Sequence, residues 1–507
     1  MRNIQKLIAA FLFTASIFAG EIYFCTNDIG KMPLLQGGRV KPLSVHAKES
    51  IKHLTGKSKI DGLSAPQIYC LLSASAFGMP NKLNLKTRIE HKDTRKLLDG
   101  KTEMSYKDLL DEQRTIRTAW MRIKDETSAK KDLNRLMAKI ALYQDIASAS
   151  NWTIPQYTGN KISWIPLAAF LTEDKVKAAK LSGGNPFEKL FIDAKNEYIK
   201  IDGDLFLLEY KYDQMQLMKI AMILTLIALA ALVLFKKFAI ALGLSVVIVV
   251  LQTAFLALRV YISGRAPVTN MYETVLFSGY GGLILAMIIG HYKKEKTFIY
   301  MGLAYNLCCL MMINFAGSMV NESISPLVPV LRDNFWLSTH VTTIIISYGA
   351  LALSWVMANT IIVKKFFSKL TKADEIYYND LIYTSLKYGT TLLAAGIILG
   401  GVWADYSWGR FWGWDPKETW SLIVLCIYIA ILHGKYTAWI PAHRFAHLIA
   451  AAFMSVMMAW FGVNYILASG LHSYGFSEGG AIFLGSFFAI QTLVLLITFR
   501  SSKQTKA

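Results

Sequence analysis

The second part of the chain is poor in acidic residues. Residues 215–507 contain only 11 of the 35 Asp and Glu, whereas residues 1–214 contain 24 of them together with 33 of the 54 Lys and Arg. So few acidic side chains over that length exclude an ordinary soluble domain there, and the 54% hydrophobic composition points the same way. The composition predicts a charged first part and a membrane-embedded second part.

Cysteine is also scarce. The five cysteines are too few and too scattered to build a disulfide framework, although Cys25 and Cys70 could meet outside a membrane. No CxxCH segment occurs, so the chain does not look like a c-type cytochrome itself. No recognised nucleic-acid-binding module accompanies the net charge of +19, much of which lies in short loops between apolar runs. We therefore interpret the charge as a topology signal plus a basic soluble domain, with no nucleic acid as a partner.

The first part of the chain is interpreted as an exported domain. Residues 1–20 have Arg2 and Lys6 ahead of an apolar stretch and predict a signal peptide or an N-terminal anchor, with cleavage at Ala19 undecided. Residues 21–214 predict a soluble domain on the outer side of the membrane, helical over 105–149. Its three histidines are expected at the surface: His46, His53 and His91.

The second part predicts an all-α polytopic membrane protein. A helix that spans a bilayer needs about 20 apolar residues, and residues 215–500 contain about nine such runs. They are placed near 215–235, 238–262, 271–290, 298–318, 336–363, 388–404, 419–436, 445–468 and 480–499.

The basic residues of this part predict its orientation. Alternate loops between the apolar runs are rich in lysine, whereas the other loops have few basic residues. The lysine-rich segments are Lys236–Lys237, Lys293–Lys296, Lys364–Lys372, Lys435–Arg444 and Arg500–Lys506. The positive-inside rule places these segments in the cytoplasm, including the tail 501–507. Residues 21–214 and the connection between the sixth and seventh runs then lie in the periplasm, for a chain in a bacterial inner membrane.

That connection, residues 403–420, is unusually rich in tryptophan. It contains five Trp in eighteen residues, interleaved with glycines and three acidic residues. An aromatic belt at the membrane interface explains one or two Trp but not this density. Glycines allow a planar ligand to approach the backbone, and indole rings offer it a flat apolar surface. The segment therefore predicts a binding site for a flat macrocycle.

The segment Trp408–Glu418, WGRFWGWDPKE, resembles the tryptophan-rich WWD signature, WGxxWxWDxxE, of proteins that handle heme during cytochrome c maturation. Residues 264–274, GRAPVTNMYET, are similar to a loop of the CcsA/ResC branch, and the resemblance covers residues 215–500. Residues 37–43 are more weakly similar to the exported stretch ahead of the CcsA half in fused CcsB–CcsA proteins. The chain thus resembles the C-terminal part of such a fused protein.

The resemblance implies a set of heme-binding residues. His340 and His472 lie at outer ends of predicted spans and fit the two axial ligands of the iron. The Trp-rich segment would form the platform beside them, through Trp408, Gly409, Trp412, Gly413, Trp414, Asp415 and Glu418. For Asp415 and Glu418, stabilisation of a helix N-terminus is an equal alternative.

His433 fits a second heme site of the family, inside the membrane. It lies about 22 Å along the seventh span from Glu418, at ~1.5 Å per residue, and an ionisable residue at that depth is a functional candidate. No multi-span CcsB half precedes residue 215, so either the second ligand of this site comes from a separate CcsB/ResB-type subunit or the chain is a truncated gene product.

The implied function is cytochrome c synthesis. The protein would hold heme b at the outer face of the membrane while the CxxCH thiols of apocytochrome c, kept reduced by extracytoplasmic thiol reductants, add to its vinyl groups. Carriage of heme across the membrane would accompany this role. Two alternatives remain open from the sequence: a heme exporter or chaperone of the CcmC type without ligase activity, and a scaffold for a separate synthase subunit.

Overall fold

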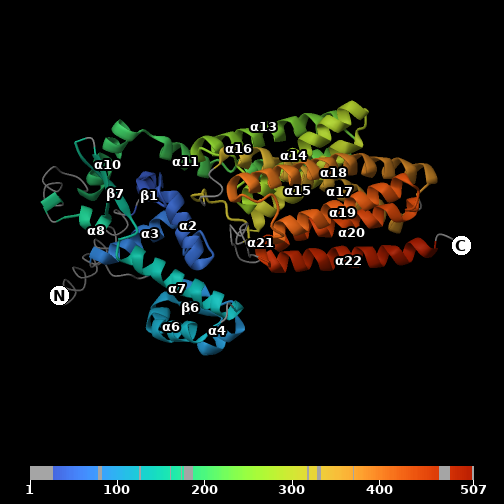
Figure 1. Ribbon diagram of the computed structural model, residues 1–507. Helices are drawn as coiled ribbons and strands as arrows, with labels where there is room; N and C mark the ends of the chain where they lie inside the picture. The colour runs from blue at the N-terminus through green and yellow to red at the C-terminus, as the bar shows by residue number, and fades with distance from the viewer. Residues whose placement is uncertain are drawn as a thin grey trace, which may run out of the picture. The chain divides into compact units, whose positions relative to one another are not determined.

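The computed structural model describes most of the chain, and it divides into two compact units, Met1–Met215 and Gln216–Ala507. The described residues are 25, 27–77, 83–124, 127–159, 161–172, 174–175, 186–316, 319–327, 333–368, 370–467 and 480–504. Figure 1 shows mixed helices and short strands in the first unit and long helices in the second.

The first unit consists of helices and four two-stranded antiparallel sheets, β1–β2, β3–β4, β5–β6 and β7–β8. Gly37 and Gly38 both have positive φ and make the turn of the first hairpin. The strands are Pro33–Gln36, Arg39–Pro42, Lys59–Ile60, Leu63–Ser64, Lys86–Arg88, Glu103–Ser105, Thr153–Thr158 and Lys161–Pro166. The α-helices are α2 (Leu43–Thr55), α3 (Ala65–Ser73), α4 (Lys92–Leu97), α5 (Tyr106–Asp111), α6 (Gln113–Arg122), α7 (Ser128–Ala147), α8 (Leu167–Phe170), α10 (Pro186–Asp202) and α11 (Leu205–Gln214).

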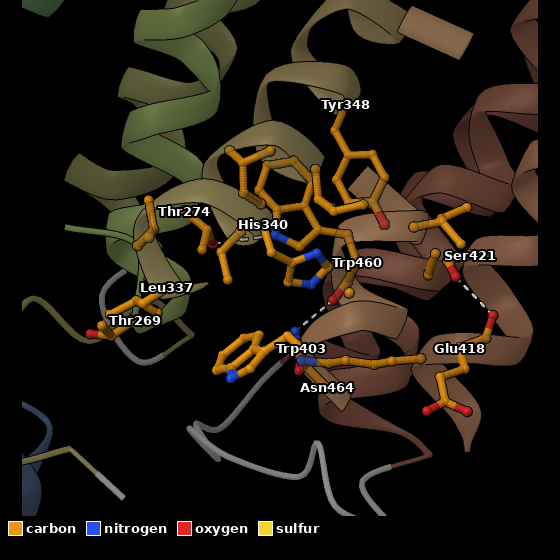
Figure 2. A pocket seen from close by; sticks show the side chains of 18 of the residues that line it. Thr269, Thr274, Leu337, His340, Tyr348, Trp403, Glu418, Ser421, Trp460 and Asn464 are labelled. Carbon is orange, nitrogen blue, oxygen red and sulfur yellow. Dashed lines mark hydrogen bonds between the residues drawn. The ribbon is translucent and has the colours of Figure 1, made fainter. Parts of the chain in front are cut away.

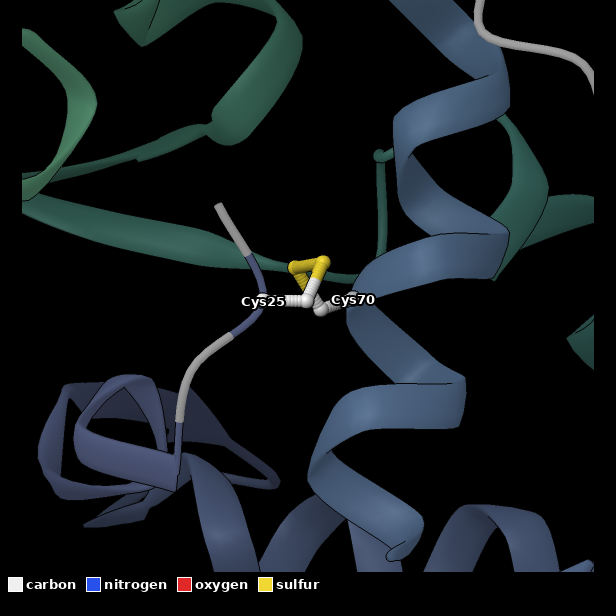
Figure 3. Close-up of a disulfide and its surroundings, with 2 residues drawn as sticks. All are labelled: Cys25 and Cys70. Atoms are coloured by element: carbon white, nitrogen blue, oxygen red, sulfur yellow. A yellow bond between two sulfur atoms is a disulfide. The ribbon is translucent and has the colours of Figure 1, made fainter. Parts of the chain in front are cut away.

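A disulfide joins the start of this unit to its core. Cys25 and Cys70 are bonded, and Figure 3 shows the bond between the segment ahead of 3₁₀-helix η1 (Asn27–Lys31) and helix α3. The sequence left this pairing open. Both cysteines are buried in one apolar core with Leu34, Ile51 and Trp152. The bond restricts the chain ahead of the first hairpin, which reduces the conformational freedom of the unfolded state.

The prediction of three surface histidines is wrong for His46. Its side chain is buried, and its Nε2 lies 2.6 Å from the side-chain oxygen of Asn151, which also accepts a hydrogen bond from Tyr69. An amide oxygen only accepts, so Nε2 carries a proton. His53, by contrast, is exposed as expected.

The second unit is an all-α membrane bundle, as predicted. Over the residues that the structure describes, nine helical segments are long and apolar enough to cross a membrane. They are Leu205–Val233, Phe238–Ser263, Met271–Lys293, Thr297–Phe315, Asn334–Phe367, Lys372–Trp408, Pro416–Tyr436, Ala442–Tyr465 and Gly480–Phe499. Their α-helices are α12 (Leu217–Val233), α13 (Phe238–Ser263), α14 (Met271–Lys293), α15 (Thr297–Phe315), α16 (Asn334–Trp336), α17 (Thr342–Phe367), α18 (Lys372–Trp408), α19 (Pro416–Tyr436), α20 (Ala442–Met457), α21 (Val463–Tyr465) and α22 (Gly480–Gln504).

Two of these spans contain a π-helical segment. Segment η4 (Leu337–Val341) precedes α17, and segment η5 (Met458–Gly462) lies between α20 and α21. A π-helical turn inserts an extra residue into an α-helix, and such insertions concentrate at functional sites. Both segments lie at the same pocket, described next.

Candidate functional site

One pocket brings together the ends of several membrane helices. It is lined by residues of α14, η4, α17, α18, the α18–α19 connection, α19 and η5, and encloses about 180 Å³. Figure 2 shows its side chains, which include the predicted ligand His340 and Trp403 of the Trp-rich segment. The pocket thus joins three regions far apart in the sequence: the 268–274 segment, His340, and the Trp-rich segment.

His340 is held in a defined orientation by helix α18. Its Nδ1 lies 2.8 Å from the carbonyl oxygen of Gly396. A carbonyl oxygen only accepts, so Nδ1 carries the proton and Nε2 carries the lone pair. The imidazole also packs edge-on to Trp403, with ring centres 5.7 Å apart. A side chain at Gly400 would place its Cβ 2.5 Å from Cε1 of His340, so the ring depends on glycine there.

The Trp-rich connection is shorter than the predicted 403–420. Helix α18 continues to Trp408 and ends at Gly409, which has a φ of 66°. Helix α19 begins at Pro416, and the side chain of its N-cap residue Asp415 accepts hydrogen bonds from the backbone N–H groups of Lys417 and Glu418. The connection therefore comprises residues 409–415. The residues from Trp403 to Trp408 belong to helix α18, because none of them is a helix-ending residue and the first such residue is Gly409.

The predicted platform is divided between the pocket and the surface. Trp412 lines the pocket, together with Phe411 and Glu418. Trp408 and Trp414 are not among the lining residues, and Trp414 is 69% exposed. The structure therefore gives the three predicted tryptophans two different environments.

Gly413 and Gly409 have local structural roles. The Arg410 guanidinium lies directly over Gly413, where any side chain would collide with it. Its Cζ also lies 5.8 Å from the centre of the Trp408 ring. Gly409 adopts the left-handed conformation that ends α18. The two glycines therefore shape a compact turn within the Trp-rich connection.

Glu418 stabilises the N-terminus of α19 and also faces the pocket. Its Oε2 accepts hydrogen bonds from the backbone N–H groups of Gly413, at 2.7 Å, and Asp415, at 3.3 Å, which closes the capping box of α19. It also lines the pocket. Its Oε1 lies 3.8 Å from Nη1 of Arg410, too far for a hydrogen bond.

Several polar atoms around the pocket are buried without a hydrogen-bond partner among the described residues. They are the indole nitrogens of Trp403 and Trp412, Nη1 of Arg410 and Oε1 of Glu418. A buried polar atom without a partner is costly, so such a cluster points to a ligand or to water. Two donors on indole rings and one on a guanidinium suit a ligand that has acceptor groups at the edge of an apolar body.

The inner wall of the pocket was not predicted. It contains Tyr348, Trp460 and Asn464, with the Trp460 indole N–H donating to Thr274 Oγ1 at 3.3 Å. The rings of Tyr348 and Trp460 lie 5.6 Å apart. Polar residues within apolar spans, such as Asn464, were the available sequence signal.

A buried ion pair fixes the 268–271 edge of the pocket. Arg259 and Glu273 are each 1% exposed, with Arg259 Nε 2.7 Å from Glu273 Oε1. Glu273 Oε2 accepts from the backbone N–H and the hydroxyl of Thr269, both at 2.7 Å. Arg259 also donates to the carbonyl oxygens of Glu322 and Ser323, which ties the segment after α15 to this edge.

The remaining predicted ligands lie elsewhere. His433 is in the last turn of α19, exposed on the surface of this chain, with its Nδ1 3.1 Å from the carbonyl oxygen of Ile429. It does not line the pocket. His472 lies outside the described residues.

Residues 268–472 match the family described as cytochrome C assembly protein. The chain is 32% identical over 272 residues to the cytochrome c biogenesis protein CcsA of Guillardia theta, covering 48% of this chain and 88% of that protein. It is 34% identical over 224 residues to CcsA of Chlamydomonas reinhardtii, covering 42% and 62%. It is 37% identical over 232 residues to protein NrfI of Wolinella succinogenes, covering 44% of this chain and only a quarter (25%) of that protein.

The chain belongs to the CcsA family of cytochrome c biogenesis proteins. This confirms the resemblance predicted from the Trp-rich segment. The similarity extends over about half of the chain and lies in its membrane part, where the pocket is.

Proposed function

We propose that this protein binds heme b in the pocket of the membrane bundle and promotes its covalent attachment to apocytochrome c. One observation carries the proposal: His340 and the Trp-rich connection, which are far apart in the sequence, line the same pocket. In a member of a cytochrome c biogenesis family, an imidazole beside several aromatic side chains suits an iron porphyrin.

The chemistry of His340 fits an axial ligand. Because Gly396 accepts the Nδ1 proton, the lone pair for a metal is on Nε2. The Gly396 carbonyl acts on His340 as the hydrogen-bond partner of a metal-bound histidine commonly does, fixing its tautomer and ring orientation. His472 remains the proposed second ligand, on the predicted loop after the eighth span.

The reaction proposed is the addition of two thiols to two vinyl groups. In each addition, the cysteine sulfur bonds to the vinyl carbon next to the porphyrin ring, and a hydrogen goes to the outer vinyl carbon. No atom is lost and no electron is gained or lost overall. The protein need supply no nucleophile, because its task is to position heme with the vinyl edge accessible to the CxxCH segment. Extracytoplasmic thiol reductants would keep both apocytochrome thiols reduced.

The exposure of His433 supports a site shared with another subunit. A histidine on the outside of a membrane bundle destabilises the protein when it faces lipid, and this cost is removed when it binds a ligand or contacts a partner subunit. We therefore propose that His433 is one ligand of a heme within the membrane. A CcsB/ResB-type subunit would supply the other ligand.

The proposed location is a bacterial inner membrane, with residues 21–214 and the pocket on the periplasmic side. The distribution of lysine-rich loops supports this orientation. A site on that side would be accessible to exported apocytochrome. Passage of heme through the protein to reach it is part of the same proposal.

A reporter experiment tests the function. The chain is expressed with a CcsB-type partner and a reporter cytochrome that carries one CxxCH, in cells without their own maturation proteins. Covalent heme on the reporter, which survives a denaturing gel, is the expected result. It should be lost in His340→Ala and retained in the matched control His291→Ala, since His291 lies outside the pocket.

The two alternatives give different results in the same experiment. An exporter or chaperone would show a heme spectrum in the purified protein but no covalent heme on the reporter. A scaffold would support covalent attachment without any heme spectrum of its own. Either pattern would contradict the proposed synthase.

A further inference from the structure

The pocket as it stands is too small for the ligand proposed for it. It encloses about 180 Å³, whereas pockets for drug-sized ligands range over roughly 300–1,000 Å³. A porphyrin is larger than most such ligands. Some part of the wall must therefore move before heme can enter.

Most of the wall is fixed in the membrane bundle. Trp403, Tyr348 and Trp460 lie on membrane-spanning helices and are 7%, 5% and 6% exposed. Phe411 differs from these residues in its location and in its exposure. It lies on the 409–415 connection and is 49% exposed, yet it lines the pocket.

The ring of Phe411 rests on a glycine of α18. A Cβ at Gly401 would lie 2.4 Å from Cζ of Phe411 and 2.7 Å from its Cε1 and Cε2. The ring therefore fills the place that a side chain at position 401 would take. Gly401 itself is buried, so the ring covers that part of the helix.

The backbone around Phe411 is anchored at both ends but not in the middle. The N–H of Gly409 donates to the carbonyl oxygen of Asp405 at 2.8 Å, and the N–H of Gly413 donates to Glu418. Trp414 then adopts a φ of 57°, which is unfavourable for a residue with a side chain. Among the described residues, no backbone hydrogen bond holds the N–H of Arg410, Phe411 or Trp412.

We propose that Phe411 is the gate of the pocket and Gly401 its seat. In the closed state the ring covers Gly401, and in the open state it swings out into solvent while residues 409 and 413–415 stay anchored. Both positions are outside the fixed residues of the WWD signature, since Phe411 occupies one of its variable positions. This inference rests on the proposed heme site but concerns the rate at which the site fills.

The gate predicts that removal of the ring speeds entry of heme. Phe411 is already half exposed, so the open state exposes only the other half of its apolar surface. The free-energy cost of exposing that half favours the closed state about tenfold. Phe411→Ala should raise the association rate of heme by about that factor. Gly401→Ala should do the same, because its methyl group displaces the ring from its seat.

Stopped-flow absorbance of the full-length protein, purified without heme in detergent, measures this rate after mixing with ferric heme. The matched control is Phe335→Ala, since Phe335 is 64% exposed and does not line the pocket. Faster association in both pocket variants, with the final heme spectrum and the control unchanged, supports the gate. An unchanged association rate with faster dissociation in Phe411→Ala would make Phe411 a wall of the site and overturn the gate.

A second measurement tests the gate without heme. Ser421 lines the pocket from α19, so Ser421→Cys places a thiol in the pocket of a protein that also carries Cys308→Ala, Cys309→Ala and Cys426→Ala. A maleimide reagent should label this thiol about tenfold faster when Phe411→Ala is added. Equal labelling rates would overturn the gate. If the wild-type protein binds no heme yet labelling accelerates, the proposed function fails and the gate stands.

Discussion

The Nδ1 of His340 lies 2.8 Å from the carbonyl oxygen of Gly396, a residue 56 positions later in the sequence. This contact joins two membrane spans. It determines which nitrogen of the imidazole carries the proton. It also directs the ring across α18, where Gly400 leaves room for it. The orientation of the proposed iron ligand is therefore set by a neighbouring helix rather than by its own.

Gly400→Ala should weaken heme binding without changing the fold. A methyl group there would lie 2.5 Å from Cε1 of His340, so the ring must turn away and its bond to Gly396 is strained. We expect heme affinity to fall by roughly tenfold or more, which corresponds to ~1.4 kcal/mol. Equilibrium titration by heme absorbance measures it. The control is Gly485→Ala, because nothing lies within 4 Å of a Cβ at Gly485; equal affinities in the two variants would contradict the role of Gly400.

Arg259→Leu should destabilise the membrane unit. The substitution leaves Glu273 buried without its partner and removes the donor to the carbonyl oxygens of Glu322 and Ser323. Breaking a buried ion pair costs about 3–5 kcal/mol. Thermal unfolding in detergent should show a lower midpoint than wild type. Adding Glu273→Leu removes the unpaired charge and should recover part of the loss, and a double variant less stable than the single one would refute this explanation.

Acid should destabilise the first unit through His46. Burial lowers the pKa of His46 to about 4, from an ordinary value of 6.5. The unfolded state therefore binds a proton between pH 6.5 and 4 that the folded state does not, so stability is full above pH 6.5 and falls as the pH drops toward 4. The loss at pH 5 is about 2 kcal/mol.

Hydrogen exchange of the α2 segment in the full-length protein tests this pH dependence. Protection should decrease between pH 7 and pH 5, after correction for the intrinsic exchange rates. His46→Gln keeps a donor for Asn151 but does not titrate, so its protection should change less over the same range. The same decrease in both proteins would show that another group is responsible.

The membrane spans were predictable because each is a run of apolar residues long enough to cross a bilayer. The end of α18 was not, since the aromatic residues from Trp403 to Trp408 are compatible with helix or loop and only the backbone of Gly409 ends it. Burial of His46 was missed because its partner, Asn151, is 105 residues away. A contact at that separation leaves no local pattern in the sequence.

The candidate site was predicted only in part, because the sequence motif identifies some of its residues and long-range contacts bring in the others. His340, Trp412 and Glu418 were identified from motif and position, and they do meet in one pocket. Trp460 and Thr274 were missed, since their hydrogen bond joins residues 186 positions apart. Phe411 lies within the motif but at a variable position, so its contact with Gly401 emerged only from the packing.

The heme absorbance spectrum of the purified protein with its CcsB-type partner tests the central claim most directly. We expect a six-coordinate heme spectrum at the pocket that is lost in His340→Gly, restored by added imidazole, and unchanged in His291→Ala. Because His433 lies outside the pocket, His433→Ala should leave that signal in place. A His340→Gly protein with the wild-type spectrum, in the absence of imidazole, would contradict the proposed ligand and the heme site built around it.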